Sequence, residues 1–148
     1  MPNTLQHRYH LQLEQYWNSL RGTRPFPLES EVNPDEISDL WPSCFLVSID
    51  DVTRRVGYRY SYLGEELIKA YGEDANHPDT VLRLLAAANA PMARKFDEVV
   101  KYGKPVIDES TFINLKHLDI KYRTCLLPLG TGDGMVTHVL GCMRWRAY

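Results

Sequence analysis

The stretch CLLPLGTGDGMVTHVLG, residues 125–141, places three glycines within five positions. A glycine-rich loop that binds phosphate leads into a helix, whose N-terminal N–H groups then face the anion. Residues 135–140, MVTHVL, are instead rich in β-branched side chains and carry no helix cap, which predicts a strand. Asp133 and Gly134 both tolerate the positive φ of a tight hairpin turn. We therefore predict a β-hairpin across this stretch and no phosphate site.

The composition is typical of one globular domain with a core of its own. The chain has 148 residues, of which 44% are hydrophobic and 24% charged. No apolar run approaches the roughly 20 residues of a membrane helix, and residues 1–10 lack the pattern of a signal peptide. The net charge of −2 disfavours nucleic acid as the main partner. We expect a cytoplasmic protein with no membrane span and no nucleic-acid partner.

The cysteines show no recognised metal motif. Cys44, Cys125 and Cys142 are far apart in the sequence, whereas a zinc site favours close pairs such as C-x-x-C. No two histidines or carboxylates show ligand spacing either. We interpret the cysteines as small buried apolar side chains and predict no metal site.

Hydrophobic periodicity predicts an α+β domain. Helices are expected at 4–20, directly after Asn33, at 64–71, 79–89 and 91–102, and strands at 44–49, 54–63, 105–115, 119–129 and 135–146. Two strands, a helical crossover and three further strands predict one five-stranded antiparallel sheet with the crossover on one face. We divide the chain into an N-terminal amphipathic helix, residues 1–22, and a domain at residues 23–148.

The N-terminal helix carries one apolar stripe, formed by Leu5, Tyr9, Leu13, Tyr16, Trp17 and Leu20. An amphipathic helix needs an apolar partner. Two partners fit, namely the same helix of a second chain or the sheet of its own domain. We predict the first, a homodimer in which one stripe serves both subunits. The alternative is that the stripe only caps its own domain.

Tyrosines dominate the candidate ligand pocket. Tyr58, Tyr60 and Tyr62 alternate along one predicted strand and should share one face. With residues of the crossover they could line a pocket that has apolar walls and a few polar groups. The same residues could instead fill the core with their hydroxyls hydrogen-bonded. The ligand-pocket candidates are Tyr58, Tyr60, Tyr62, Tyr71, Met92, Phe96, Tyr122 and His138.

The sequence contains no recognised catalytic motif. No serine or cysteine nucleophile lies in a pattern such as G-x-S-x-G. Asp108 and Glu109 are adjacent in a predicted strand, so they point to opposite faces and cannot act together; we interpret both as solvated. We predict that the chain is not an enzyme and has no catalytic residues. The alternative is a small isomerase-like enzyme on a cone-shaped α+β fold, which requires His138 or Asp108 to face a cavity.

The order of elements resembles that of a PAS domain, and more narrowly an alphaproteobacterial PAS-like family of single-domain proteins. The resemblance rests on YWNSLRG, NPDEISDLWPSCFLVSID, YRYSYLGEEL and YRTCLLPLGTGDG, and covers about Tyr16 to Trp145. Glu65 and His77-Pro78 depart from the family pattern. The resemblance implies a non-enzymatic sensor or adaptor in bacterial signal transduction, which acts in trans on a partner protein and binds a small ligand.

The same resemblance gives two tests for cofactors, and both are negative. Haem-binding PAS domains use a histidine on the helical crossover, but Pro78 directly follows His77 here. Flavin-binding photosensors of this fold carry a reactive cysteine in an Asn-Cys-Arg-Phe-Leu-Gln context, which none of the three cysteines matches. We expect no cofactor.

Overall fold

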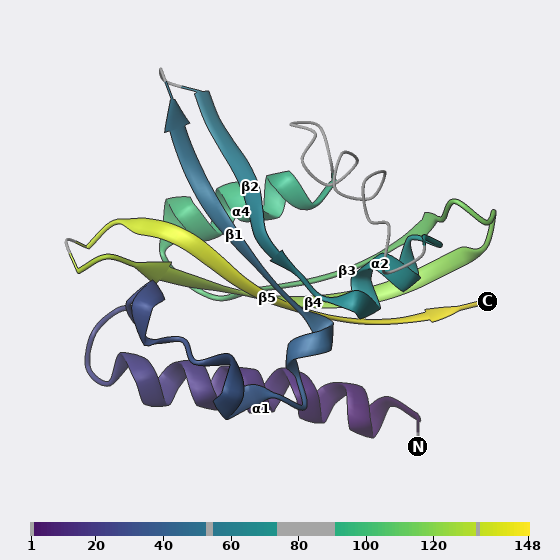
Figure 1. The fold of residues 1–148 in the computed structure, drawn as a ribbon, viewed down its shortest axis with the longest axis horizontal. Helices are drawn as coiled ribbons and strands as arrows, with labels where there is room; N and C mark the ends of the chain where they lie inside the picture. Colours follow the sequence, from purple (N-terminus) through teal and green to yellow (C-terminus); the bar gives the residue numbers. More distant parts are fainter. Residues whose placement is uncertain (1, 53–54, 74–90, 133) are drawn as a thin grey trace.

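The structure is a computed structural model that describes residues 2–52, 55–73, 91–132 and 134–148. They form an antiparallel sheet with the strand order β2-β1-β5-β4-β3 (Figure 1). The strands are β1 (Cys44–Val52), β2 (Arg55–Leu63), β3 (Val106–Ile113), β4 (Asp119–Gly130) and β5 (Val136–Ala147). The helices are α1 (Pro2–Arg21), α2 (Glu65–Ala70) and α4 (Pro91–Tyr102), and the 3-10 turns are η1 (Glu29–Glu31), η2 (Pro34–Ile37) and η3 (Trp41–Ser43). The predicted α+β class and sheet are confirmed, while the helix expected at 79–89 lies outside the described residues.

Helices cover both faces of the sheet. Helices α2 and α4 lie over one face, and α1 with the 3-10 turns lies over the other (Figure 1). We call these the α4 face and the α1 face. The central strand β5 serves both, because its side chains alternate: Val139 and Met143 are buried on the α4 face, and Leu140 and Cys142 on the α1 face. None of the described helices is both long and apolar enough to cross a membrane.

The glycine-rich stretch is a hairpin turn. Strands β4 and β5 pair antiparallel up to Gly130 and Val136. Gly132 and Gly134 adopt φ of +99° and +84°, a region that favours glycine. A strand follows the turn, so the hairpin prediction is confirmed and no helix N-terminus is available for a phosphate.

A β-bulge in β2 changes which face its side chains occupy. Leu46 of β1 pairs with Tyr62, but the next residue, Val47, pairs with Tyr60. Ser61 is therefore the extra residue of the bulge. One inserted residue reverses the alternation of side chains beyond it.

Tyr62 consequently lies on the α1 face. Its ring stacks on Trp41 with the ring centroids 4.2 Å apart, and its hydroxyl donates a 2.8 Å hydrogen bond to the Trp41 carbonyl oxygen. Tyr58 and Tyr60 pack on the α4 face. The expectation that these three tyrosines share one face is wrong for Tyr62.

Helix α1 packs against the sheet of its own chain. Leu13 is fully buried and Trp17 is 4% exposed. The Trp17 Nε1–H donates a 2.8 Å hydrogen bond to the Pro128 carbonyl oxygen of β4. Tyr9 and Tyr16 pack at the edge of the same cluster. This arrangement favours the capping alternative for these residues, and self-association through the stripe stays a prediction.

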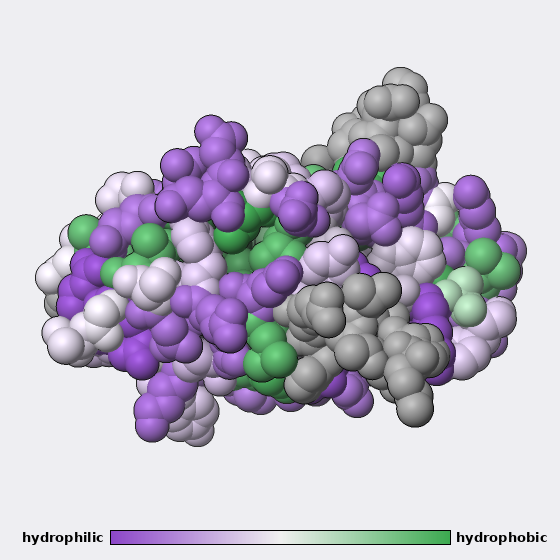
Figure 2. Space-filling view, turned by 90° about the horizontal axis from the view of Figure 1, so that it is seen from below, coloured by the Kyte–Doolittle hydropathy of each residue, from purple (hydrophilic) through white to green (hydrophobic). Residues whose placement is uncertain are grey.

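The surface on the α1 side is mostly hydrophilic. Figure 2 views the molecule from that side, and its coloured residues show apolar side chains only in small separate patches. Helix α1 therefore turns its polar residues, such as Gln12 and Asn18, toward solvent; Leu11 is an apolar exception at 43% exposure.

Candidate functional site

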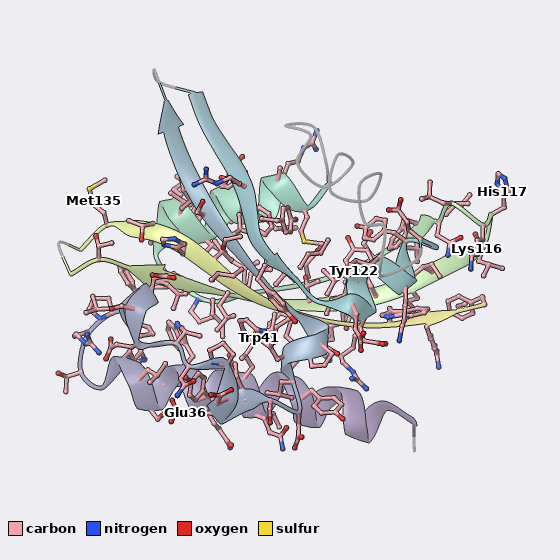
Figure 3. All side chains as sticks on the ribbon, in the orientation of Figure 1. Glu36, Trp41, Lys116, His117, Tyr122 and Met135 are labelled. Atoms are coloured by element: carbon pink, nitrogen blue, oxygen red, sulfur yellow. The ribbon has the colours of Figure 1, made fainter. Side chains whose placement is uncertain are left out.

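Three tyrosine hydroxyls converge on the α4 face. Tyr60 comes from β2, Tyr71 directly follows α2, and Tyr122 comes from β4. The rings of Tyr71 and Tyr122 both contact Phe112, and both phenols contribute to raising the pKa of Tyr60. Tyr122 is labelled in Figure 3 and belongs to the cluster between the sheet and the helices α2 and α4. Residues separated in the sequence thus meet at one buried place.

Helix α4 supplies the apolar wall of this site. Phe96 is 1% exposed and lies at its centre, with its ring centroid 5.1 Å from Tyr58, 6.2 Å from Tyr60 and 6.3 Å from Phe45. One turn earlier, the Met92 sulfur lies 3.8 Å from the Tyr60 hydroxyl oxygen. The aromatic edges and the thioether form a close-packed, water-excluding surface.

Tyr71 is positioned by a stacking contact of its ring and by a hydrogen bond at the end of α2. The ring of Tyr71 stacks on Phe112 of β3 at 4.4 Å, and Phe112 contacts Tyr122 at 5.7 Å. The buried amide of Asn114 donates a 3.1 Å hydrogen bond to the Ala70 carbonyl oxygen at the end of α2. This bond fixes the end of the helix that positions Tyr71.

A carboxylate lies beside Tyr122. The Tyr122 hydroxyl hydrogen-bonds to Asp108 and Ser110 of β3. The Asp108 side chain is 15% exposed, and its Oδ1 lies 3.9 Å from Nζ of Lys95 on α4. Asp108 therefore belongs to this site, and the interpretation of its side chain as solvated is wrong. The sequence could have indicated this placement, because Asp108, Ser110 and Phe112 alternate along one strand and so share a face.

Burial raises the pKa values of these phenols, which are protonated at neutral pH. Loss of water raises the pKa of Tyr60 and of Tyr71 well above the ordinary value. The pKa of Tyr58 is raised by burial and by its hydrogen bond to Asp97, and the pKa of Tyr122 by burial and the charge of Asp108. The hydroxyls are therefore neutral donors and acceptors, suited to holding a ligand's polar group and not to removing protons.

The sequence matches the family model of the PAS domain over residues 5–144. The chain belongs to the PAS domain family. Two solved structures show the same fold: a Light-Oxygen-Voltage domain studied with a flavin analogue, and an RNA-binding Light-Oxygen-Voltage receptor. The first is 13% identical, with 78% of this chain and 86% of that chain covered and a TM-score of 0.55. The second is 17% identical, with coverages of 80% and 35% and a TM-score of 0.52. No curated protein sequence matches the chain.

This PAS domain assembles most of the predicted pocket residues at one place. Its sensory family is generally not catalytic. The residues that the α4 face brings together are Tyr58, Tyr60, Met92, Phe96 and Tyr122, with Tyr71 stacked on Phe112 of the same cluster. Sequence reasoning missed three more, Phe45, Asp108 and Phe112.

Two predicted pocket residues lie on the opposite face of the PAS sheet. Tyr62 is turned there by the bulge. His138 pairs with Leu129, which is buried on the α1 face, so His138 shares that face. Its Nδ1 lies 2.9 Å from the Thr137 hydroxyl oxygen. His138 thus cannot face the tyrosine site, which removes one basis of the isomerase alternative.

Within the described ranges, no group of three histidine, cysteine or acidic side chains is placed to hold a metal ion.

We expect the folded PAS domain to lose stability above about pH 10, the ordinary pKa of tyrosine. The pKa values of Tyr60 and Tyr71 are raised in the folded state, so this state holds the phenol protons more tightly than the unfolded chain. The contribution of these two phenols to the free energy of unfolding is fully present below their pKa in the unfolded chain. It is lost as the pH rises toward their pKa in the folded state. Near-ultraviolet phenolate absorbance and circular dichroism should therefore change together. Exposed Tyr148, whose pKa is lowered by Arg146, should ionise first while the fold is intact. Early ionisation of all tyrosines in an intact fold would contradict the expectation.

Proposed function

We propose that this PAS domain is a non-enzymatic sensor that binds a small molecule between α4 and the sheet and acts on a partner protein in signal transduction. The observation that carries the proposal is the convergence of three buried hydroxyls, of Tyr60, Tyr71 and Tyr122, within apolar walls. Ligand sites commonly combine a mostly apolar lining with a few placed polar groups. The family's sensory role supports this assignment.

The chemistry of the site favours a mostly apolar molecule that carries a carbonyl or carboxylate oxygen. Neutral phenols can donate to such an oxygen at neutral pH. The Tyr60 hydroxyl contacts the Met92 sulfur, which is a weak acceptor, so a ligand oxygen would give it a stronger hydrogen bond. At the edge of the site, Lys95 and Asp108 could select the polar end of the ligand.

The proposal is tested by native mass spectrometry of the protein purified from its own host. We expect a bound small molecule that is released on unfolding, and no haem or flavin absorbance, since neither cofactor context is present. Tyr60→Phe and Tyr122→Phe should each lower its occupancy, because each removes one hydroxyl and keeps the ring. Tyr102→Phe is the matched control, since Tyr102 is 61% exposed at the far end of α4. Protein with no bound molecule, or equal occupancy in all variants, would refute the site.

The homodimer remains a prediction within this proposal. Because Leu13 and Trp17 are buried against their own sheet, an interface on α1 would use the half-buried Tyr9, Tyr16 and Leu20. Light scattering compares the molar mass of Leu20→Glu with that of the unmodified chain. If the stripe holds a dimer, the unmodified chain should be a dimer and Leu20→Glu a monomer.

A further inference from the structure

The three cysteines, which the sequence separates widely, meet in one row on the α1 face. Cys44 of β1 lies opposite Cys142 of β5, and Cys142 lies opposite Cys125 of β4. All three are fully buried free thiols. They belong to the cluster that Leu13 and Trp17 of α1 complete. Leu13 and Trp17 of α1 therefore share one buried cluster with a line of thiols that crosses three adjacent strands.

The backbone shows which two thiols are closest. The Cys44 carbonyl oxygen accepts a 2.8 Å hydrogen bond from the Gly64 N–H, on the β2 side. The N–H and C=O of one strand residue point toward the same neighbouring strand, so Cys44 directs neither of them at Cys142. Cys44 and Cys142 thus form the closer, non-hydrogen-bonded type of antiparallel pair, with Cα atoms about 4.5 Å apart.

This spacing lies within the roughly 4.4–6.8 Å range of Cα separations in disulfides, as does the roughly 5.5 Å of the wider type of pair. The interaction with the Cys142 thiol is the main reason that the pKa of Cys44 is raised. Cys125 faces Cys142 across the wider type of pair, with a Cα separation of about 5.5 Å. The row is therefore one close pair of thiols with a third thiol beside it.

The row does not suit a single metal ion. Neighbouring strands lie about 4.8 Å apart, so the outer cysteines, Cys44 and Cys125, are separated by roughly 10 Å. Thiolate ligands of one zinc ion must each lie about 2.3 Å from it. The geometry therefore points to chemistry between two sulfurs.

We propose that Cys44 and Cys142 are a redox-active dithiol that hydrogen peroxide converts into a cross-strand disulfide. One cysteine, as its thiolate, attacks a peroxide oxygen; the O–O bond breaks, and a sulfenic acid and one water form. The second thiol attacks that sulfur, the S–O bond breaks, the S–S bond forms, and a second water leaves. The two thiols lose two electrons and two protons, and one peroxide becomes two waters.

Helix α1 controls access to this dithiol. Burial raises the pKa of Cys125 to about 12, and the Cys142 contact together with burial raises that of Cys44 well above the usual range. A protonated buried thiol is a poor nucleophile. Oxidation is therefore slow while Leu13 and Trp17 cover the row, and becomes faster when the helix lifts. This inference is independent of the tyrosine site, which lies on the opposite face of the sheet.

The test uses the full, reduced chain treated with hydrogen peroxide under native conditions. After alkylation in denaturant, we expect a monomer that has lost two hydrogens and yields a Cys44–Cys142 linked peptide, both reversed by dithiothreitol. Cys125→Ala should still form the link, whereas Cys44→Ala and Cys142→Ala should not form it. The oxidised chain and oxidised Cys125→Ala should melt at a higher temperature than their reduced forms, because the link constrains the unfolded chain.

Three results would overturn the proposal. In the first, the thiols stay reduced under native conditions and react only after denaturant unfolds the chain. In the second, the link joins Cys125 to Cys142. In the third, the products are only intermolecular. A Leu13→Ala variant adds a kinetic check that does not depend on the cysteine substitutions. It should form the Cys44–Cys142 link faster than the unmodified chain while the chain is still folded. An unchanged rate would show that α1 does not limit access to the thiols.

Discussion

Replacing Phe96 with alanine is expected to lower the free energy of unfolding by about 3–5 kcal/mol. The ring is 1% exposed and contacts Phe45, Tyr58 and Tyr60, so its removal leaves a cavity where α4 meets the sheet. Surrounding aromatic rings relax only partly into such a cavity. Urea denaturation followed by circular dichroism measures the loss as a shift in the midpoint at an unchanged slope.

Tyr102→Ala provides the control for Phe96→Ala on the same helix. Tyr102 is 61% exposed, and surface substitutions usually change stability by less than about 0.5 kcal/mol. If both substitutions had the same effect, Phe96 would not be at the centre of the core, and the packing of α4 on the sheet would be wrong.

Trp17→Ala is expected to cost a similar amount, about 3–5 kcal/mol, on the other face. The indole is 4% exposed, and its N–H donates to the Pro128 carbonyl oxygen at 2.8 Å. Alanine removes the apolar ring and leaves that acceptor without this donor. Trp17→Phe keeps one aromatic ring but loses the N–H and part of the indole volume, so it should cost less than alanine. Thermal unfolding of the three proteins measures both.

The same variants distinguish the two partners considered for the α1 stripe. If the stripe caps its own domain, the loss in Trp17→Ala should not depend on protein concentration. If the indole instead stabilised a dimer, the melting temperature of the unmodified chain would rise with concentration, and this dependence would disappear in the variant. A melting temperature unchanged by Trp17→Ala would contradict the packing of α1 on the sheet.

Local patterns predicted the strands because turn residues and alternating side chains are features of neighbouring positions in the sequence. The β4–β5 hairpin followed from Asp133-Gly134 and the β-branched run after it. The helix ending at Tyr102 followed from its apolar spacing and from Gly103, which adopts φ of +61° in the structure. In such cases, a few adjacent residues determine the backbone.

The face of Tyr62 could not be obtained in this way. A bulge inserts one residue opposite no partner, and nothing in the YRYSYL sequence marks Ser61 as that residue. The two-residue period assigned Tyr62 to the α4 face, and a single insertion moved it to the other.

Distances across the sheet depend on register, which the sequence does not state. Cys44 and Cys142 appeared unrelated because β1 and β5 are far apart in the chain, yet they are direct partners. The tyrosine site was predicted in part, because alternation assigns Tyr60 and Tyr122 to faces. The contact of Tyr122 with Asp108 required the pairing of β3 with β4.

From the position of β5 in the sheet, we expect folding to be completed late in synthesis. The ribosome makes β5 after the other four strands, yet β5 lies at the centre and joins the β1–β2 hairpin to β3 and β4. Until β5 emerges, the nascent chain holds two hairpin regions with no strand between them, and α1 has no complete surface on which to dock. The hydrogen bond between Trp17 and Pro128 also cannot form until Pro128, 111 residues later in the chain, has been synthesised. Such long-range pairing closes large loops and is slow, so assembly is late and concerted. The apolar face of α1 must therefore stay protected from other chains for most of translation.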